Sequence, residues 1–323
     1  MKKSLIALAV LAAAGAASAQ SSVQLYGIAD VWVGGIKASG SDAKTVVESG
    51  GVSGSRWGIK GAEDLGGGLK AIFTLEQGFK IDTGAADSGF NREASVGVEG
   101  SFGTVKLGKV WTAYDDVAGA SNPVFDSALT PSAAAFASTG YTANPSNGIK
   151  YASPTYAGFN GAVSYAADEK AATGVEVTAA ALQYANGPFA AAFAYQTEQA
   201  TTAGAKAVEY TNLNASYNLG VVTVKGVYAQ RDDNNGTKDK EYQIGVDYPV
   251  ASNLVLSAGY ASSEDKVNGV KQFDNSGFGV AAAYLLSKRT TAYAGVRSTK
   301  KDYVGATADV TTNVYAVGVK HVF

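Results

Sequence analysis

Few side chains in this sequence could carry out covalent chemistry. The 323 residues contain one histidine, His321, and no cysteine. Histidine is the usual general base of hydrolytic sites, but His321 lies at the end of the chain with no nucleophile motif such as Gly-x-Ser-x-Gly elsewhere. The glycines 66–68 precede no helical pattern that could hold a phosphate. Because cysteine is absent, disulfides and zinc–cysteine sites are excluded, and the sequence predicts no metal and no cofactor.

The side chains that remain for chemistry are charged groups acting through space. Six bases are candidates: Arg56, Lys60, Arg92, Lys106, Lys109 and Lys150. Three acids, Asp115, Asp116 and Asp126, share one stretch that contains no base. Charged residues make up only 17% of the chain, with 26 bases and 28 acids. This balance offers no basic surface to nucleic acid.

The first residues are typical of a secretory signal peptide. Met1–Lys3 is a basic start, Leu5–Gly15 is an apolar stretch too short for a membrane helix, and Ala17–Ala19 is a small-residue cleavage site. We therefore expect residues 1–19 to be removed and residues 20–323 to form the exported domain.

The elements that must position the charged groups are β-strands. From Ser22 onward apolar and polar residues alternate, as in Glu241–Val250, and no convincing helical run appears. About sixteen strands are predicted, with bounds uncertain by about 2–4 residues. They start near residues 23, 52, 69, 91, 104, 148, 159, 175, 188, 207, 221, 240, 253, 276, 290 and 310.

The connectors between these strands alternate in length. Some are tight, such as Leu65–Gly68 and Ser101–Gly103, and others are long and hydrophilic, such as 37–49, 231–240 and 264–275. An even set of strands with short turns at one end and long loops at the other is typical of an outer-membrane barrel. In lipid every backbone N–H and C=O must be paired, and only a closed barrel leaves no unpaired edge.

A secreted β-sandwich would also alternate, but three features favour a transmembrane barrel. Tyrosines recur near strand ends, as in an aromatic girdle, and the polar faces carry small or amide residues rather than Lys and Glu. The chain ends on Phe323, in phase with Val317 and Val319. We expect Phe323 to be the assembly signal that the barrel-insertion machinery reads.

The longest stretch without strands runs from 112 to 147. It is rich in Ala and Ser, contains three prolines, and carries the three acids named above. So long an irregular segment inside a compact domain is usually functional or disordered. Its aromatic and small residues could pack against a wall.

Several stretches of the chain resemble the general porins of β-proteobacteria, of the neisserial and Burkholderia type. They are Ser22–Asp30, Ser55–Ala71, Phe90–Arg92, Phe102–Gly108, Leu286–Thr290 and Lys320–Phe323. The resemblance implies an all-β, sixteen-stranded antiparallel transmembrane barrel in the outer membrane, a homotrimer in outer-membrane lipid, and passive diffusion of small hydrophilic solutes and inorganic ions. It also implies that the third long extracellular loop folds into the lumen and narrows it.

In such a channel, basic wall residues facing the acidic loop would create a transverse field that orients dipolar solutes. Alternation turns Arg56, Lys60 and Lys106 inward, and the resemblance gives the basic role at the constriction to Arg56 and Arg92. Strict alternation places Arg92 on the lipid side, so either a bulge shifts the register or Arg92 lies above the membrane. Lys109 stands where the family usually has Arg. It shares parity with Val105 and Leu107, so it could lie past the membrane band or under a trimer neighbour rather than at the constriction. The acids could instead hold the loop by hydrogen bonds.

Other functions remain possible. A barrel protease or phospholipase would need a general base, and His321 is the one histidine. A substrate-specific channel would line its constriction with an aromatic row or a dense charge of one sign, and neither is clear. An adhesin or plugged barrel would need an added domain for which the length leaves no room. The field and the family permit a mild anion preference, whereas the acidic loop favours cations.

Overall fold

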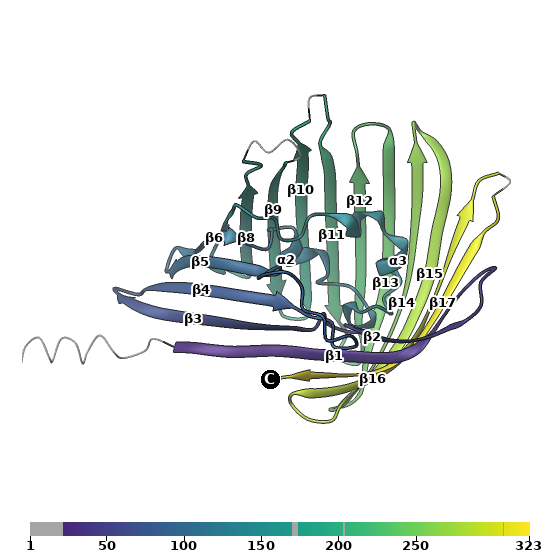
Figure 1. Cartoon of the computed structure of the whole chain (residues 1–323), viewed down its shortest axis with the longest axis horizontal. Coiled ribbons are helices and arrows are strands. Elements are labelled where there is room, and N and C mark those ends of the chain that lie inside the picture. The colour runs from purple at the N-terminus through teal and green to yellow at the C-terminus, as the bar shows by residue number, and fades with distance from the viewer. Residues whose placement is uncertain (1–21, 170–173, 203, 306) are drawn as a thin grey trace, which may run out of the picture.

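The computed structural model describes residues 22–169, 174–202, 204–305 and 307–323, so the predicted signal peptide, residues 1–19, lies outside the described residues. Seventeen strands form one sheet in which every neighbouring pair is antiparallel. The first strand, β1, also pairs with the last, β17, which closes the sheet into a barrel. Figure 1 shows β9–β15 side by side on one side of the barrel and β1, β3 and β4 crossing them on the other.

The strands are β1 (Ser22–Ala38), β2 (Lys44–Ser49), β3 (Arg56–Gly66), β4 (Leu69–Gly78), β5 (Glu93–Gly100), β6 (Gly103–Lys109), β7 (Gly148–Ala152), β8 (Phe159–Ala166), β9 (Val175–Asn186), β10 (Phe189–Ala200), β11 (Val208–Asn218), β12 (Thr223–Asp232), β13 (Thr237–Ala251), β14 (Leu254–Val267), β15 (Val270–Leu285), β16 (Thr290–Tyr303) and β17 (Val310–Val322).

Two of these segments are halves of one barrel strand. β2 pairs with Val31–Ile36 of β1, and β3 pairs with Ser22–Ile28 of the same strand. The interruption between them is held by Asp30, whose buried carboxylate accepts the backbone N–H groups of Gly51 (3.1 Å), Val52 (2.9 Å) and Ser53 (2.8 Å). The seventeen segments therefore make a sixteen-stranded barrel, which confirms the predicted all-β, sixteen-stranded antiparallel barrel.

Alternation sorts the side chains between the two faces of the wall. On β13, Tyr242 and Ile244 face outward and are 55% and 60% exposed, whereas Glu241 and Gln243 face inward and are 0% and 5% exposed. The apolar outer face suits lipid, and the polar inner face suits water.

The predicted long loop 264–275 is wrong. β14 continues to Val267 and β15 starts at Val270, so Asn268 and Gly269 alone form the turn, with φ of 51° and 77°. Asn-Gly is the usual pair for such a two-residue hairpin. The hydrophilic residues on either side are strand residues that extend beyond the roughly ten needed to cross a bilayer.

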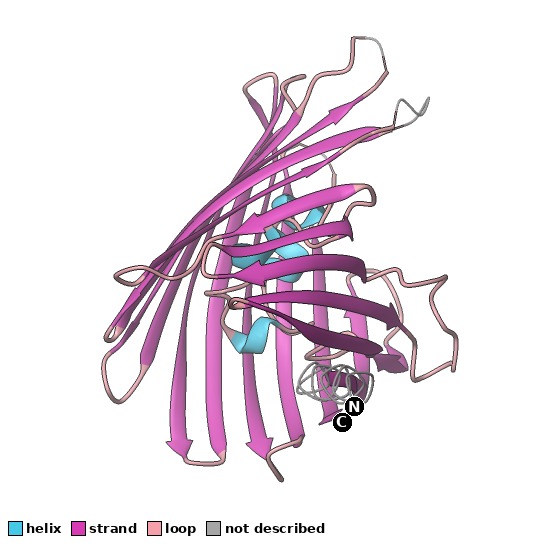
Figure 2. Cartoon of the chain, turned by 90° about the vertical axis from the view of Figure 1, so that its left-hand side faces the viewer, coloured by secondary structure: helices cyan, strands magenta, loops and turns pink. Residues whose placement is uncertain are grey.

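The segment from Val110 to Asn147 is the long connection between β6 and β7. It contains four short helical turns: α2 (Asp115–Ala118), η1 (Val124–Asp126), α3 (Ser132–Ala135) and η2 (Ala137–Gly140). Figures 1 and 2 both show the short helices within the outline of the barrel. In the described residues no helix has the length and apolar character to cross a membrane.

The chain end completes the closure. Phe323 exchanges two backbone hydrogen bonds of 3.0 Å with Gly27 of β1. Its ring lies over Gly27, where a Cβ atom would overlap it. The last residue of the chain is therefore part of the seam.

Candidate functional site

The segment 110–147 packs against the inward faces of β8–β16. Around α2, the side chains of Ala113, Tyr114 and Val117 are buried against small wall residues. These wall residues are Ala162, Ala179, Ala181, Ala192 and Ala194, together with Tyr210. Alanines on the inner face leave room for a helix that larger side chains would exclude.

A row of three glycines receives the middle of the segment. Gly245, Gly259 and Gly279 occupy directly paired positions on β13, β14 and β15. A Cβ atom at Gly245 or Gly259 would overlap the ring of Pro123, and one at Gly279 would overlap the carbonyl oxygen of Leu129. The glycines therefore let the backbone of the segment lie directly on the wall.

Neutral wall side chains anchor the first part of the segment. The Val124 N–H donates to Ser257 Oγ (2.7 Å), and the Ser132 N–H donates to Gln243 Oε1 (3.2 Å). On the same side, Asn214 Nδ2 donates to the carbonyl of Val117 (3.0 Å). These bonds satisfy backbone groups that the packing removes from water.

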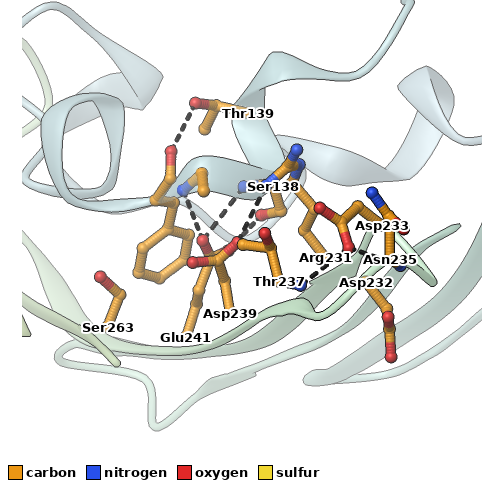
Figure 3. A network of polar contacts seen from close by, with 12 residues as sticks. Ser138, Thr139, Arg231, Asp232, Asp233, Asn235, Thr237, Asp239, Glu241 and Ser263 are labelled. Carbon is orange, nitrogen blue, oxygen red and sulfur yellow. Dashed lines mark hydrogen bonds and ion pairs between the residues drawn. The ribbon is translucent and has the colours of Figure 1, made fainter. Parts of the chain in front are cut away.

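Carboxylates anchor the second part. Glu241 accepts the N–H groups of Ala137 (2.5 Å) and Ser138 (3.0 Å) and the Ser138 hydroxyl. Glu198 accepts the N–H (2.5 Å) and hydroxyl (3.0 Å) of Thr142. Figure 3 shows Glu241 beneath Ser138, with Asp239 and Arg231 beside it.

The opposite wall carries a cluster of charges centred on Glu76. This carboxylate accepts Arg92 Nε at 2.6 Å and the Tyr26 hydroxyl at 2.9 Å, and it lies 3.7 Å from Arg56 Nε. Two arginines predicted at the constriction therefore share one carboxylate. Glu76 is 8% exposed, so the pairs are partly shielded from solvent.

The position of Arg92 resolves the register problem in the sequence. Arg92 donates its backbone N–H to the carbonyl of Glu76 (3.2 Å), while Glu93 is the paired residue opposite Glu76. Two consecutive residues thus oppose one, as in a β-bulge. Both side chains line one cavity between the wall and the segment, which is what the bulge alternative predicts.

Two lysines continue the basic wall. Lys106 and Lys150 are directly paired on β6 and β7. Lys106 Nζ lies 2.8 Å from Glu93, and Lys150 Nζ lies 2.6 Å from Asp116 of the segment. The second pair joins the basic wall to the acidic segment.

These groups surround a cavity of about 740 Å³ between the wall and the segment. Its bases are Arg92, Lys106 and Lys150, and its acids are Glu93, Glu99, Asp115 and Asp116. Five of the predicted site residues therefore meet here, and Arg56 adjoins them through Glu76.

Three predicted site residues lie elsewhere in the described structure. Lys60 is exposed, with Nζ 5.1 Å from the centre of the Tyr26 ring. Lys109 Nζ donates to the carbonyl of Asn144 (2.5 Å) and so holds the end of the segment. Asp126 ends a left-handed turn and accepts Asn122 Nδ2 (2.7 Å).

Asp115 is the loop acid with the most distinctive surroundings. Burial raises the pKa of its carboxyl above the ordinary 3.8, and the nearby Asp116 acts in the same direction. The Tyr141 hydroxyl donates to Asp115 at 2.6 Å and partly opposes this rise in pKa. Asp115 therefore takes up a proton more readily than an ordinary aspartate.

Four residues of the site were missed from the sequence. Glu93, Glu99 and Trp111 line the cavity, and Tyr26 binds Glu76. Glu99 and Tyr26 occupy inward positions by alternation, so a full parity count would have found them. Glu93 has the same parity as Glu99 and could have been found in the same way, whereas Trp111 lies beyond the strand, where parity gives no information.

A closed barrel with an apolar outer face, a polar inner face and a charged cavity beside an inner segment defines a channel of the outer membrane. The chain matches the model of the Gram-negative porin family over residues 5–320 and belongs to that family. This confirms the resemblance drawn from the sequence.

Individual relatives agree with this assignment. Outer membrane porin protein 32 of Delftia acidovorans is 36% identical over 99% of this chain and 95% of its own length. Major outer membrane protein P.IA of Neisseria meningitidis is 28% identical over 84% of this chain and 82% of its own. A solved anion-selective porin from Comamonas acidovorans superposes with a TM-score of 0.81 at 27% identity, covering 94% of this chain and all of that one (100%).

Proposed function

We propose that this porin is a general diffusion channel with weak charge selectivity, constricted between the basic wall and the segment 110–147. Small hydrophilic solutes and inorganic ions pass down their gradients without energy coupling. The observation that carries the proposal is the cavity in which Arg92, Lys106 and Lys150 face Asp115 and Asp116. Opposed charges of this kind hold water and orient dipolar solutes.

Weak selectivity is supported by the ion pairs. Each base of the cavity has an acid within 3 Å: Arg92 with Glu76 (2.6 Å), Lys106 with Glu93 (2.8 Å) and Lys150 with Asp116 (2.6 Å). The net field on a passing ion is therefore small. A mild anion preference is the direction we favour, because the similar Comamonas porin is anion-selective.

The relatives are channels rather than enzymes, and we propose that this chain has no catalytic activity. We further propose a homotrimer that is exported after removal of residues 1–19, with Phe323 as the assembly signal. OmpT of Vibrio cholerae, which has the same fold at 20% identity, has a trimer form.

Planar-bilayer recording with a KCl gradient tests the channel. We expect stable conductance with current steps in groups of three. The reversal potential should be small, with the sign that indicates anion selectivity. Arg56→Gln should move the reversal potential toward cations, whereas Arg289→Gln, in the β15–β16 turn far from the cavity, should not. Absence of conductance would refute the channel, and an unchanged potential in Arg56→Gln would remove Arg56 from the constriction.

A further inference from the structure

The cavity has an apolar side that diffusion of ions does not require. Besides its charges it is lined by Trp111, Ile72, Val110 and Ala152. Ile72 stands in an inward series of β4 that otherwise contains Lys70, Thr74 and Glu76. Apolar surface facing water in a narrow passage favours solutes that can cover it.

Trp111 is held in place at this apolar side. It lies between β6 and α2, and the Arg92 guanidinium lies 4.9 Å from the centre of its ring. Arg92 is itself fixed by Glu76 at 2.6 Å. The indole remains partly exposed, so a preset aromatic surface faces the cavity.

The two lysines of the cavity retain hydrogen-bonding capacity. An ammonium group has three donors. Lys106 Nζ uses one on Glu93, and Lys150 Nζ uses two, on Asp116 and on the carbonyl of Thr112 (3.4 Å). The two lysines are directly paired across β6 and β7 and line the same cavity, so each can offer a remaining donor to a solute there.

The geometry points to a weak binding site for aromatic carboxylates within the channel. The ring of the solute contacts Trp111, and its carboxylate accepts hydrogen bonds from Lys106 and Lys150. The volume of about 740 Å³ is ample for a molecule with one aromatic ring. This inference rests on the proposed diffusion function and names a class of solutes that the channel favours.

Block of the chloride current by benzoate tests the site. The full protein is recorded in planar bilayers in KCl, with benzoate or acetate added on one side. We expect benzoate to block at a concentration about fivefold lower than acetate, the size of one aromatic contact. Equal block by the two carboxylates would overturn the proposal, whereas a protein without any chloride current would instead refute the diffusion channel.

Variants separate the two halves of the site. Trp111→Ala should remove the difference between benzoate and acetate, and Trp111→Phe should keep it. The matched control is Trp57→Ala, because Trp57 binds Gln77 at a position outside the cavity. Benzoate should block this variant at the same concentration as it blocks the parent channel. A benzoate preference that survives Trp111→Ala would contradict the aromatic contact.

Neutral and cationic probes test the carboxylate contact. Benzyl alcohol and benzylammonium carry the same ring without the carboxylate, so we expect neither to block at the concentrations at which benzoate does. The double variant Lys106→Gln, Lys150→Gln should lose benzoate block while still conducting. Block by benzyl alcohol equal to that by benzoate would overturn the role of the lysines.

Discussion

The wall formed by β3–β7 differs from the wall formed by β9–β16 in the side chains that each turns inward. The first carries arginines, lysines and glutamates joined in ion pairs, and a cavity lies in front of it. The second carries alanines, glycines, amides and two anchoring carboxylates, Glu198 and Glu241, and the segment 110–147 lies directly against it. We call these the charged wall and the docking wall.

The difference shows how one barrel can hold a passage and a fixed constriction together. Long charged side chains keep space hydrated because they are costly to dry. Small side chains allow close packing, and wall amides replace the water that the segment loses. A constriction of constant width therefore depends on the docking wall as well as on the charges.

The largest expected effect comes from filling the docking wall. Gly259→Val would force Pro123 off the wall, because even a Cβ atom overlaps its ring, and we expect a loss of about 1–3 kcal/mol in the free energy of unfolding. Urea unfolding in detergent and single-channel conductance would both report the change. The control is Ala258→Val, one residue away on the outward face. Equal behaviour of the two variants would mean that the segment does not depend on the glycine row.

A more local effect is expected from cutting a carboxylate anchor. Glu241→Ala leaves the N–H groups of Ala137 and Ser138 without their acceptor, at a cost of roughly 1–3 kcal/mol confined to this part of the segment. Added protease should then cut within residues 133–142 faster than in the parent. Lys240→Ala, the outward neighbour, serves as the reference. Unchanged cleavage would show that the first part of the segment alone fixes the second.

On the charged wall, Glu76→Gln should act mainly on ion selectivity. It removes the one charge that Arg56 and Arg92 share. We expect the anion-to-cation permeability ratio to rise by up to about fivefold, since a unit charge at contact distance in water contributes about 1 kcal/mol. Glu63→Gln, outside the cavity on the same barrel, should leave the ratio unchanged. A fall in the ratio would contradict the assignment.

The smallest effect is a dependence of selectivity on pH. Burial raises the pKa of Asp115 above 3.8, so on acidification Asp115 becomes neutral at a higher pH than an ordinary aspartate. Loss of that negative charge should increase the anion preference as pH falls. Reversal potentials between neutral pH and about pH 4 would show this, and Asp115→Asn should flatten the curve. The same curve in Asp115→Asn would assign the titration to another group.

The fold could be predicted from the sequence because its signal is local. Alternation requires only neighbouring residues, and Asn268–Gly269 is a hairpin signal that we missed only because the flanking residues are hydrophilic. The break between β2 and β3 depends on Asp30, whose three N–H partners become visible only once the strands are paired.

The site was less accessible because it depends on contacts between distant residues. Arg56 and Lys106 follow from parity, but Arg92 required the bulge opposite Glu76. Lys60 passes the same parity test, and Lys109 stands where the family usually has Arg, yet both lie outside the cavity. The glycine row is present in the sequence, yet its members align only when the register of β13, β14 and β15 is known.

The seam of the barrel has a consequence for how the chain matures. β1 pairs with β17, and Gly27 bonds to Phe323, so contacts that close the structure join residues from opposite ends of the sequence. Such closure has a high entropic cost and contributes only once the last strand is available. An incomplete chain would expose two unpaired edges. We therefore expect a chain that lacks β17 to leave β1 and β16 without partners at the seam and to fail to close.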